Sequence, residues 1–79
     1  MRLDKFLKVS RIIKRRTVAS DAAKGNRILV NGNIAKPSKD VKVGDIITIS
    51  FGNSEFKVRI LSTPEYTKAD DAKEMYEVI

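Results

Sequence analysis

The sequence predicts a small α+β domain in which two N-terminal helices pack on a small antiparallel sheet. Apolar residues recur at helical spacing before residue 25, whereas from residue 27 onward they tend to alternate with polar residues, as in strands. Tight-turn residues such as Asn31-Gly32 separate the strand-like segments. We expect residues 1–79 to form a single domain, because the chain has no linker and its apolar fraction of 42% is close to that of ordinary globular proteins.

The spacing of Leu3, Phe6 and Leu7 predicts a first helix over about residues 3–9. Asp4 falls on the opposite side of this helix, in its first turn, where a carboxylate interacts favourably with the positive end of the helix dipole. The apolar side is therefore expected to face the core, and the charged side to face solvent.

A second helix is predicted over residues 18–24, with Thr17 as its N-cap. Its apolar face consists of valine and alanine, and these small residues suit close packing. Gly25-Asn26 ends this helix, because both residues tolerate a left-handed backbone conformation.

The remaining segments predict an antiparallel meander. Strands are expected over residues 27–30, 33–35, 46–51 and 55–61. Asn31-Gly32 supplies the positive φ angles of a two-residue hairpin turn, and residues 42–45 form a second turn. Residues 68–76 are expected to form a short helix, followed by residues 77–79 as a tail or a last strand.

The net positive charge is confined to the first third of the chain. Residues 1–27 hold nine basic residues against two acidic ones, whereas residues 28–79 hold seven basic and eight acidic residues. A one-sided charge excess attracts a polyanion to one face, and several cations together are needed to displace the counterions of several phosphates. The candidate RNA-binding residues in this segment are Arg2, Lys5, Lys8, Arg11, Lys14, Arg15 and Arg16.

Two other interpretations of this basic segment are open. A charged face commonly serves only solubility, although the segregation of charge in this chain favours a binding role. An anionic membrane surface would need exposed large apolar residues, but Leu3, Phe6 and Leu7 are required for the core. We therefore expect RNA, and no membrane, as the partner.

Two roles are open for Asn31. In the first, its side chain contacts RNA from the tip of the hairpin. In the second, Asn31-Gly32 is present only because this pair favours a tight turn. Both roles can hold together, and Asn31 is a candidate RNA-binding residue.

The residue types that commonly carry catalysis and metal binding are absent or scattered. The chain has no Cys and no His, so it has no thiolate ligand and no imidazole base, and the absence of Cys fits a cytoplasmic location. We expect no catalytic residue, no metal and no cofactor, and the protein is not expected to be an enzyme. The carboxylates of two later groups are interpreted as solvated loop charges or helix-end dipole partners: Asp40, Asp45, Asp70, Asp71 and Glu74.

Four short motifs together resemble a known RNA-binding family. They are Arg2-Leu3-Asp4-Lys5-Phe6-Leu7, Lys14-Arg15-Arg16-Thr17, residues 25–32 with the Val30-Asn31-Gly32 turn, and Lys42-Val43-Gly44-Asp45. This combination, over about residues 2–51, is similar to the S-four domain, first recognised in ribosomal small-subunit protein four. The resemblance implies two helices packed on a small antiparallel sheet, with helix residues and the hairpin gripping structured RNA.

Over its whole length the chain is most similar to stand-alone bacterial members of this family that act in ribosome-associated quality control. The resemblance implies a non-catalytic protein that binds the stalled large ribosomal subunit and contacts its ribosomal RNA and the peptidyl-tRNA. It would support C-terminal alanine tailing by an RqcH/NEMF-type tailing factor, and we expect it to be a monomer. The alternatives are heat-shock-type recycling of large subunits, a structural ribosomal protein, and an RNA-modifying enzyme, for which no residues remain.

Overall fold

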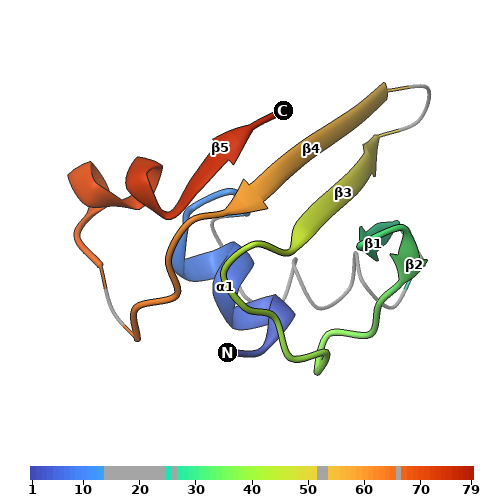
Figure 1. Cartoon of the computed structure of the whole chain (residues 1–79), viewed down its shortest axis with the longest axis horizontal. Helices are drawn as coiled ribbons and strands as arrows, with labels where there is room; N and C mark the ends of the chain where they lie inside the picture. The colour runs from blue at the N-terminus through green and yellow to red at the C-terminus, as the bar shows by residue number, and fades with distance from the viewer. Residues whose placement is uncertain (14–24, 26, 52–53, 66) are drawn as a thin grey trace.

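The computed structural model describes residues 1–13, 25, 27–51, 54–65 and 67–79. Helix α1 (Leu3–Val9) has the predicted bounds, and the second helix predicted over residues 18–24 lies outside the described residues. No helix of the described part is long and apolar enough to span a membrane. The elements that follow α1 (Figure 1) are β1 (Ile28–Val30), β2 (Asn33–Ile34), β3 (Ile46–Phe51), β4 (Ser54–Ile60), the 3-10 helix η1 (Ala69–Met75) and β5 (Tyr76–Val78).

The strands form one five-stranded antiparallel sheet in the order β2-β1-β3-β4-β5. The predicted meander is therefore wrong at one step, because β3 lies beside β1 and not beside β2. Ile28 and Val30 of β1 are buried, whereas both residues of β2 are exposed. The exposed strand β2 thus lies at the edge of the sheet, and the more apolar strand β1 lies between β2 and β3. The segment after η1, for which a tail or a strand was expected, is strand β5 and pairs with β4.

A two-residue turn joins β1 and β2, as the sequence predicts. Val30 pairs with Asn33 across the hairpin. Between them, Asn31 has a φ angle of 53° and Gly32 a φ angle of 84°. Two positive φ angles define a type I′ turn, whose twist matches that of the flanking strands.

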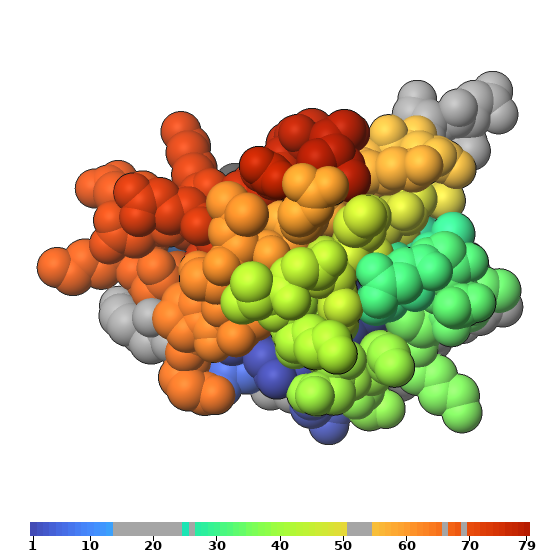
Figure 2. Space-filling view, viewed as in Figure 1, coloured from blue at the N-terminus to red at the C-terminus, as the bar shows by residue number. Residues whose placement is uncertain are grey.

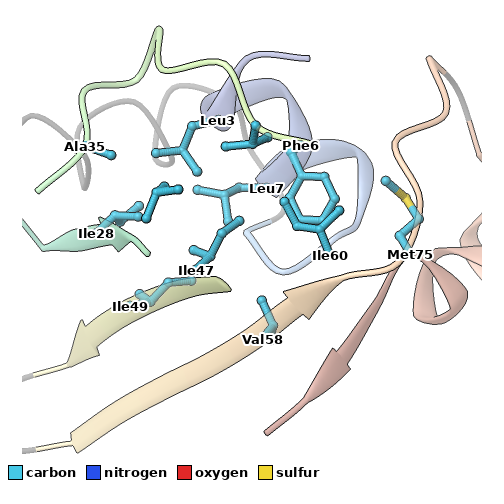
Figure 3. Packing of buried hydrophobic residues seen from close by; sticks show 12 residues of the cluster. Leu3, Phe6, Leu7, Ile28, Ala35, Ile47, Ile49, Val58, Ile60 and Met75 are labelled. Carbon is cyan, nitrogen blue, oxygen red and sulfur yellow. The ribbon is translucent and has the colours of Figure 1, made fainter. Parts of the chain in front are cut away.

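One hydrophobic core lies between α1 and the sheet. Leu3, Phe6 and Leu7 of α1 are fully buried. In Figure 3, Phe6 lies beside Ile60 and Met75, while Leu7 points toward β3. Burial of each large side chain contributes roughly 1.5–3 kcal/mol, so these three residues fix the helix to the sheet. The sheet residues of this core are Ile28, Val30, Ile47, Ile49, Val58 and Ile60.

The segment between β2 and β3 is hydrogen-bonded to the start of α1. The Leu3 N–H donates to the Lys39 carbonyl at 2.8 Å, and the Val41 N–H donates to the Met1 carbonyl at 2.8 Å. The Met1 ammonium bonds the Asp40 carboxylate at 2.8 Å, and this contact holds the pKa of Asp40 below its usual range. These bonds lead the chain past α1 to the other side of β1, where β3 pairs (Figure 1).

The carboxylate of Asp45 joins two turns of the chain. Its Oδ2 accepts a hydrogen bond from the Lys42 N–H at 3.1 Å, and its Oδ1 accepts one from Asn31 Nδ2 at 3.1 Å. Gly44 before it has a φ angle of 94°, a conformation that glycine adopts without steric cost. The interpretation of Asp45 as a solvated loop charge is therefore wrong. The residue is 8% exposed, because donors of the protein replace water around its oxygens.

We predict that Asp45→Ala lowers the free energy of unfolding by about 1–3 kcal/mol, because two donors lose their acceptor in a partly buried place. Chemical denaturation of the whole chain measures this change. Asp70→Ala is the control, since Asp70 is exposed and its loss should change the free energy by less than about 0.5 kcal/mol. Equal losses in the two variants would contradict the role given to Asp45.

Candidate nucleic-acid interface

Arg2 precedes α1 and is oriented by a buried carboxylate. Its Nε and Nη2 donate to the two oxygens of Asp4, each at 3.2 Å, and Asp4 also accepts the Lys5 N–H at 2.8 Å. The Asp4 side chain is only 5% exposed, so the expectation that Asp4 faces solvent is wrong. Charged and N–H donors surround this carboxylate in place of water. Arg2 is thereby held at the surface with further N–H donors beyond those that bind Asp4.

Lys5, on α1, is paired with Glu65 from the segment after β4. The Lys5 ammonium holds the pKa of Glu65 below its usual range. The Glu65 side chain is 82% exposed, and exposed ion pairs contribute little to stability. A phosphate that approaches Lys5 therefore has to displace only a weakly held carboxylate.

Lys8 and Arg11 lie at the C-terminal end of α1, and both are exposed. Lys8 is in the last turn, where a cation interacts favourably with the negative end of the helix dipole. Arg11 follows the C-cap Ser10 and has a φ angle of 62°. Helices commonly place glycine in this left-handed conformation just after the C-cap.

The left-handed backbone conformation of Arg11 lowers the stability of the fold, whereas glycine at this position would adopt it without this cost. A left-handed conformation is unfavourable by roughly 1–2 kcal/mol for a residue with a Cβ atom. The Arg11 N–H donates to the Lys8 carbonyl at 3.1 Å, and the Ile13 N–H donates to the Leu7 carbonyl at 3.1 Å. Glycine would allow the same bonds, so the arginine adds a cation at the expense of backbone strain. Strain of this kind is concentrated at functional positions.

The cations on the outer face of the sheet have carboxylate partners. Lys57 Nζ lies 3.9 Å from Glu55, and Arg59 Nη1 lies 2.5 Å from Glu77. By contrast, the described part of the chain contains no ion-pair partner for Lys8. In Figure 2 the visible face is formed mainly by residues after 28. The cations of β4 are thus paired, whereas Lys8 can bind an anion without displacing a described carboxylate.

The structure brings four of the candidate RNA-binding residues together on and around α1: Arg2, Lys5, Lys8 and Arg11. Three others lie outside the described residues: Lys14, Arg15 and Arg16. Asn31 is at the hairpin tip, where its Oδ1 accepts the Ile46 N–H at 2.9 Å and its Nδ2 binds Asp45. Its side chain therefore has a structural role in the turn, and its contact with RNA stays a prediction.

Sequence reasoning missed two further lysines beside α1. Lys36 and Lys39 form one turn, in which the Lys39 N–H donates to the Lys36 carbonyl at 3.0 Å. Both lysines are exposed, and neither pairs with a carboxylate in the described ranges. The Pro37 carbonyl of this turn accepts the Asp4 N–H at 3.1 Å, which brings the turn to the helix. Nothing in the local sequence signals this proximity, because it depends on bonds between distant segments.

The chemistry that these residues offer is anion binding. Ammonium and guanidinium groups donate hydrogen bonds to phosphate, and arginine does so with two parallel N–H groups. Within the described ranges, no group of three or more His, Cys, Asp or Glu side chains is arranged to hold a metal ion.

Comparison with known families gives a match to the S4 domain over residues 1–47. The chain belongs to the S4 domain family. The matched part includes α1, the β1–β2 hairpin and the turn that contains Asp45. The resemblance drawn from the sequence motifs is therefore confirmed.

Relatives and solved structures of this family cover the whole chain. Proteins named RQC P-site tRNA stabilizing factor are 57% identical in Streptococcus pneumoniae and 51% identical in Bacillus subtilis. Each alignment spans 79 residues, which is all of this chain and 90% or 92% of the relative. The trimeric structure of Vibrio cholerae Heat Shock Protein 15 superposes with a TM-score of 0.90 at 34% identity, covering all of this chain and 81% of that one. The chain thus has a small S4-like fold with a five-stranded antiparallel sheet.

We predict that Glu65→Gln binds RNA up to about fivefold more tightly at neutral pH, because the carboxylate that occupies Lys5 is removed. Fluorescence anisotropy with a labelled RNA stem-loop measures this affinity. Glu74→Gln is the matched control, since it removes the same charge from an exposed position in η1. An equal gain in both variants would mean that total charge, and not the pair with Lys5, sets the affinity.

The ion pair between Lys5 and Glu65 makes the folding stability depend on pH, and the sign of this dependence follows from the pKa shift. The pKa of Glu65 is lower in the folded state than in the unfolded state. The stabilising contribution is therefore present above the unfolded pKa and is lost as the pH falls through the folded pKa. Thermal melts across this range should show a larger loss in the wild type than in Glu65→Gln, in which only the contribution of Glu65 is missing and that of Asp40 remains.

We predict that Arg11→Gly leaves the free energy of unfolding unchanged or raises it by up to about 1 kcal/mol, because glycine relieves the strain at this φ angle. The same variant should bind RNA more weakly, since a phosphate contact is lost. Arg11→Ala is the control for strain, because alanine keeps the Cβ atom and loses the charge. It should lose RNA affinity to the same extent without gaining stability. Unchanged RNA affinity in both variants would contradict the proposed contact.

Proposed function

We propose that this protein is an RNA-binding factor of ribosome-associated quality control that holds the tRNA on a stalled large ribosomal subunit. The observation that carries this proposal is the group of surface cations on and around α1, which includes a guanidinium fixed by Asp4 and a strained arginine at the helix end. Full-length relatives that are 50–57% identical and are named RQC P-site tRNA stabilizing factor support the choice of tRNA and ribosome as partners.

In this proposal the chain catalyses nothing and acts by position. Arg2, Lys8 and Arg11 bind phosphates of large-subunit ribosomal RNA or of the peptidyl-tRNA, and Lys5 does so after Glu65 is displaced. Lys14, Arg15 and Arg16, which lie outside the described residues, are proposed to bind RNA phosphates as well. Binding two RNA molecules at once restrains the tRNA, because each contact is set by one rigid domain.

The partners of the factor follow from the same role. Once the tRNA is held, an RqcH/NEMF-type tailing factor brings alanyl-tRNA to the subunit and extends the stalled nascent chain at its C-terminus. The factor acts as a monomer in the cytoplasm.

A second candidate function is heat-shock-type recycling of large subunits. It is favoured by the superposition on Vibrio cholerae Heat Shock Protein 15 and by a 38% identical Aeromonas salmonicida relative named Heat shock protein 15 homolog. The identity to that relative is 38%, however, whereas the identity to the Streptococcus pneumoniae factor is 57%. The higher identity therefore supports the tRNA-stabilising role.

We predict that deletion of this protein abolishes untemplated C-terminal alanine tails on a stalled reporter protein and leaves ordinary translation nearly unchanged. Mass spectrometry of the reporter measures the tails. The double variant Arg2→Ala and Arg16→Ala should lower binding to large subunits by at least about tenfold, since charged hydrogen bonds are worth roughly 1.5–3 kcal/mol each. Co-sedimentation measures this binding, and circular dichroism checks that the variant is folded.

The matched control is the double variant Lys57→Ala and Arg59→Ala, whose cations lie on the neutral outer face. It should bind large subunits and support tailing like the wild type. A folded Arg2 and Arg16 double variant that still supports tailing would contradict the proposed site. Tails that persist after deletion, together with accumulation of stalled large subunits, would favour the recycling role.

A further inference from the structure

A small cavity lies beside the β1–β2 hairpin, and none of the residues proposed above to bind phosphate lines it. Its volume is about 210 Å³, and it is lined by Val30, Asn31, Asn33, Ile34, Ala35 and Lys39. Pockets that enclose drug-sized ligands usually measure roughly 300–1,000 Å³. This cavity is therefore of a size to admit one planar ring, not a large ligand.

The walls of the cavity combine an apolar surface with an amide. Val30 and Ala35 are each only 4% exposed, whereas Ile34 is 62% exposed and presents a large apolar side chain to solvent. Asn33 is exposed, and its side-chain amide makes no hydrogen bond within the described residues. The amide carries both donors and an acceptor, which are the groups that recognise the edge of a nucleobase.

The cavity is held in shape by the hydrogen bonds of the hairpin tip. The Asn31 N–H donates to the Ile46 carbonyl at 2.8 Å, and its side chain binds both Ile46 and Asp45. At Lys39, which also lines the cavity, the backbone carbonyl accepts the Leu3 N–H of α1 at 2.8 Å. These parts of the lining are thus fixed to the rest of the fold, so little ordering is needed when a ligand enters.

The charge around the cavity favours an anionic ligand. Lys39 lines it and Lys36 belongs to the same turn, and neither is paired with a carboxylate in the part that the structure describes. The neighbouring Asp40 is neutralised by the Met1 ammonium. The turn is bonded to the start of α1, so this positive region continues the basic surface around Arg2.

We propose that this cavity receives one unpaired RNA base, with the phosphate of that nucleotide bound by Lys36 or Lys39. The inference rests on the proposed RNA-binding function and adds a specificity for bulged or looped RNA, which phosphate contacts alone cannot give. The base packs against Ile34, and Asn33 hydrogen-bonds its edge. Recognition of RNA by proteins usually relies on such unstacked bases, because the major groove of an RNA helix is too narrow to be read.

The test compares two RNA stem-loops that differ by one bulged adenosine, using the full-length chain. Wild type should bind the bulged RNA at least about fivefold more tightly than the fully paired RNA, because the bulged base buries apolar surface against Ile34 and gains a hydrogen bond from Asn33. Ile34→Ala and Asn33→Ala should each bring the ratio of the two affinities to about one, and they should leave the affinity for the paired RNA unchanged. A fluorescent adenine analogue at the bulge should report its insertion.

Val78→Ala is the matched control, since Val78 is 63% exposed and lies on β5 at the opposite edge of the sheet. It should keep the preference. Equal affinity of the wild type for both RNAs would overturn the base-binding cavity, while salt-dependent binding to large subunits would leave the proposed function standing. Loss of large-subunit binding in Ile34→Ala, with unchanged affinity for both RNAs, would also overturn it by assigning the cavity to a protein partner. A wild type that binds neither RNA nor large subunits would overturn both proposals.

Discussion

The position of the β1–β2 hairpin depends on the hydrogen bonds that the Asp45 carboxylate accepts. This carboxylate accepts hydrogen bonds from the Asn31 side chain and from the Lys42 backbone, and so holds together two turns that are far apart in the sequence. Each turn by itself is a local structure of a few residues. Their connection fixes the hairpin tip at the start of β3, and the hairpin tip in turn forms part of the wall of the cavity beside β2.

Two acidic residues of the family motifs thus serve the fold more than its surface charge. Asp4 lies nearly buried and orients Arg2, while Asp45 lies nearly buried and orients Asn31. In each case a carboxylate fixes a side chain that carries more than one N–H donor. A basic surface that must bind RNA in one orientation needs such internal acceptors, because lysine and arginine otherwise sample many rotamers.

Local features of the fold could be predicted from the sequence, and long-range ones could not. The bounds of α1 follow from the spacing of its apolar residues, and the type I′ turn follows from Asn31-Gly32, because both depend on neighbouring residues alone. The burial of Asp4 and Asp45 was not predicted, since it depends on donors that folding brings to them. The position of β3 beside β1 was missed for the same reason, as were the lysines of the turn beside α1.

The candidate site, too, has a part that the sequence predicts and a part that it does not. The excess of cations near the N-terminus is a property of composition and needs no structure. How readily a single cation can bind phosphate depends on its surroundings. Lys5 is paired with Glu65 and Lys57 with Glu55, whereas Arg11 has a strained backbone conformation. No pattern in the sequence distinguishes these three situations, because each arises from partners or dihedral angles that only the folded chain defines.

The bonds between α1 and the segment before β3 have a consequence for the synthesis of the chain. Helix α1 is made before its partners, because its backbone partners lie at residues 37–41 and its core partners extend to Ile60 and Met75. A seven-residue helix is too short to persist alone in water. Helix α1 therefore has no stable fold of its own during synthesis and docks only when residues up to Met75 have been made. Arg2, Lys5 and Lys8 take their final places on the surface only then.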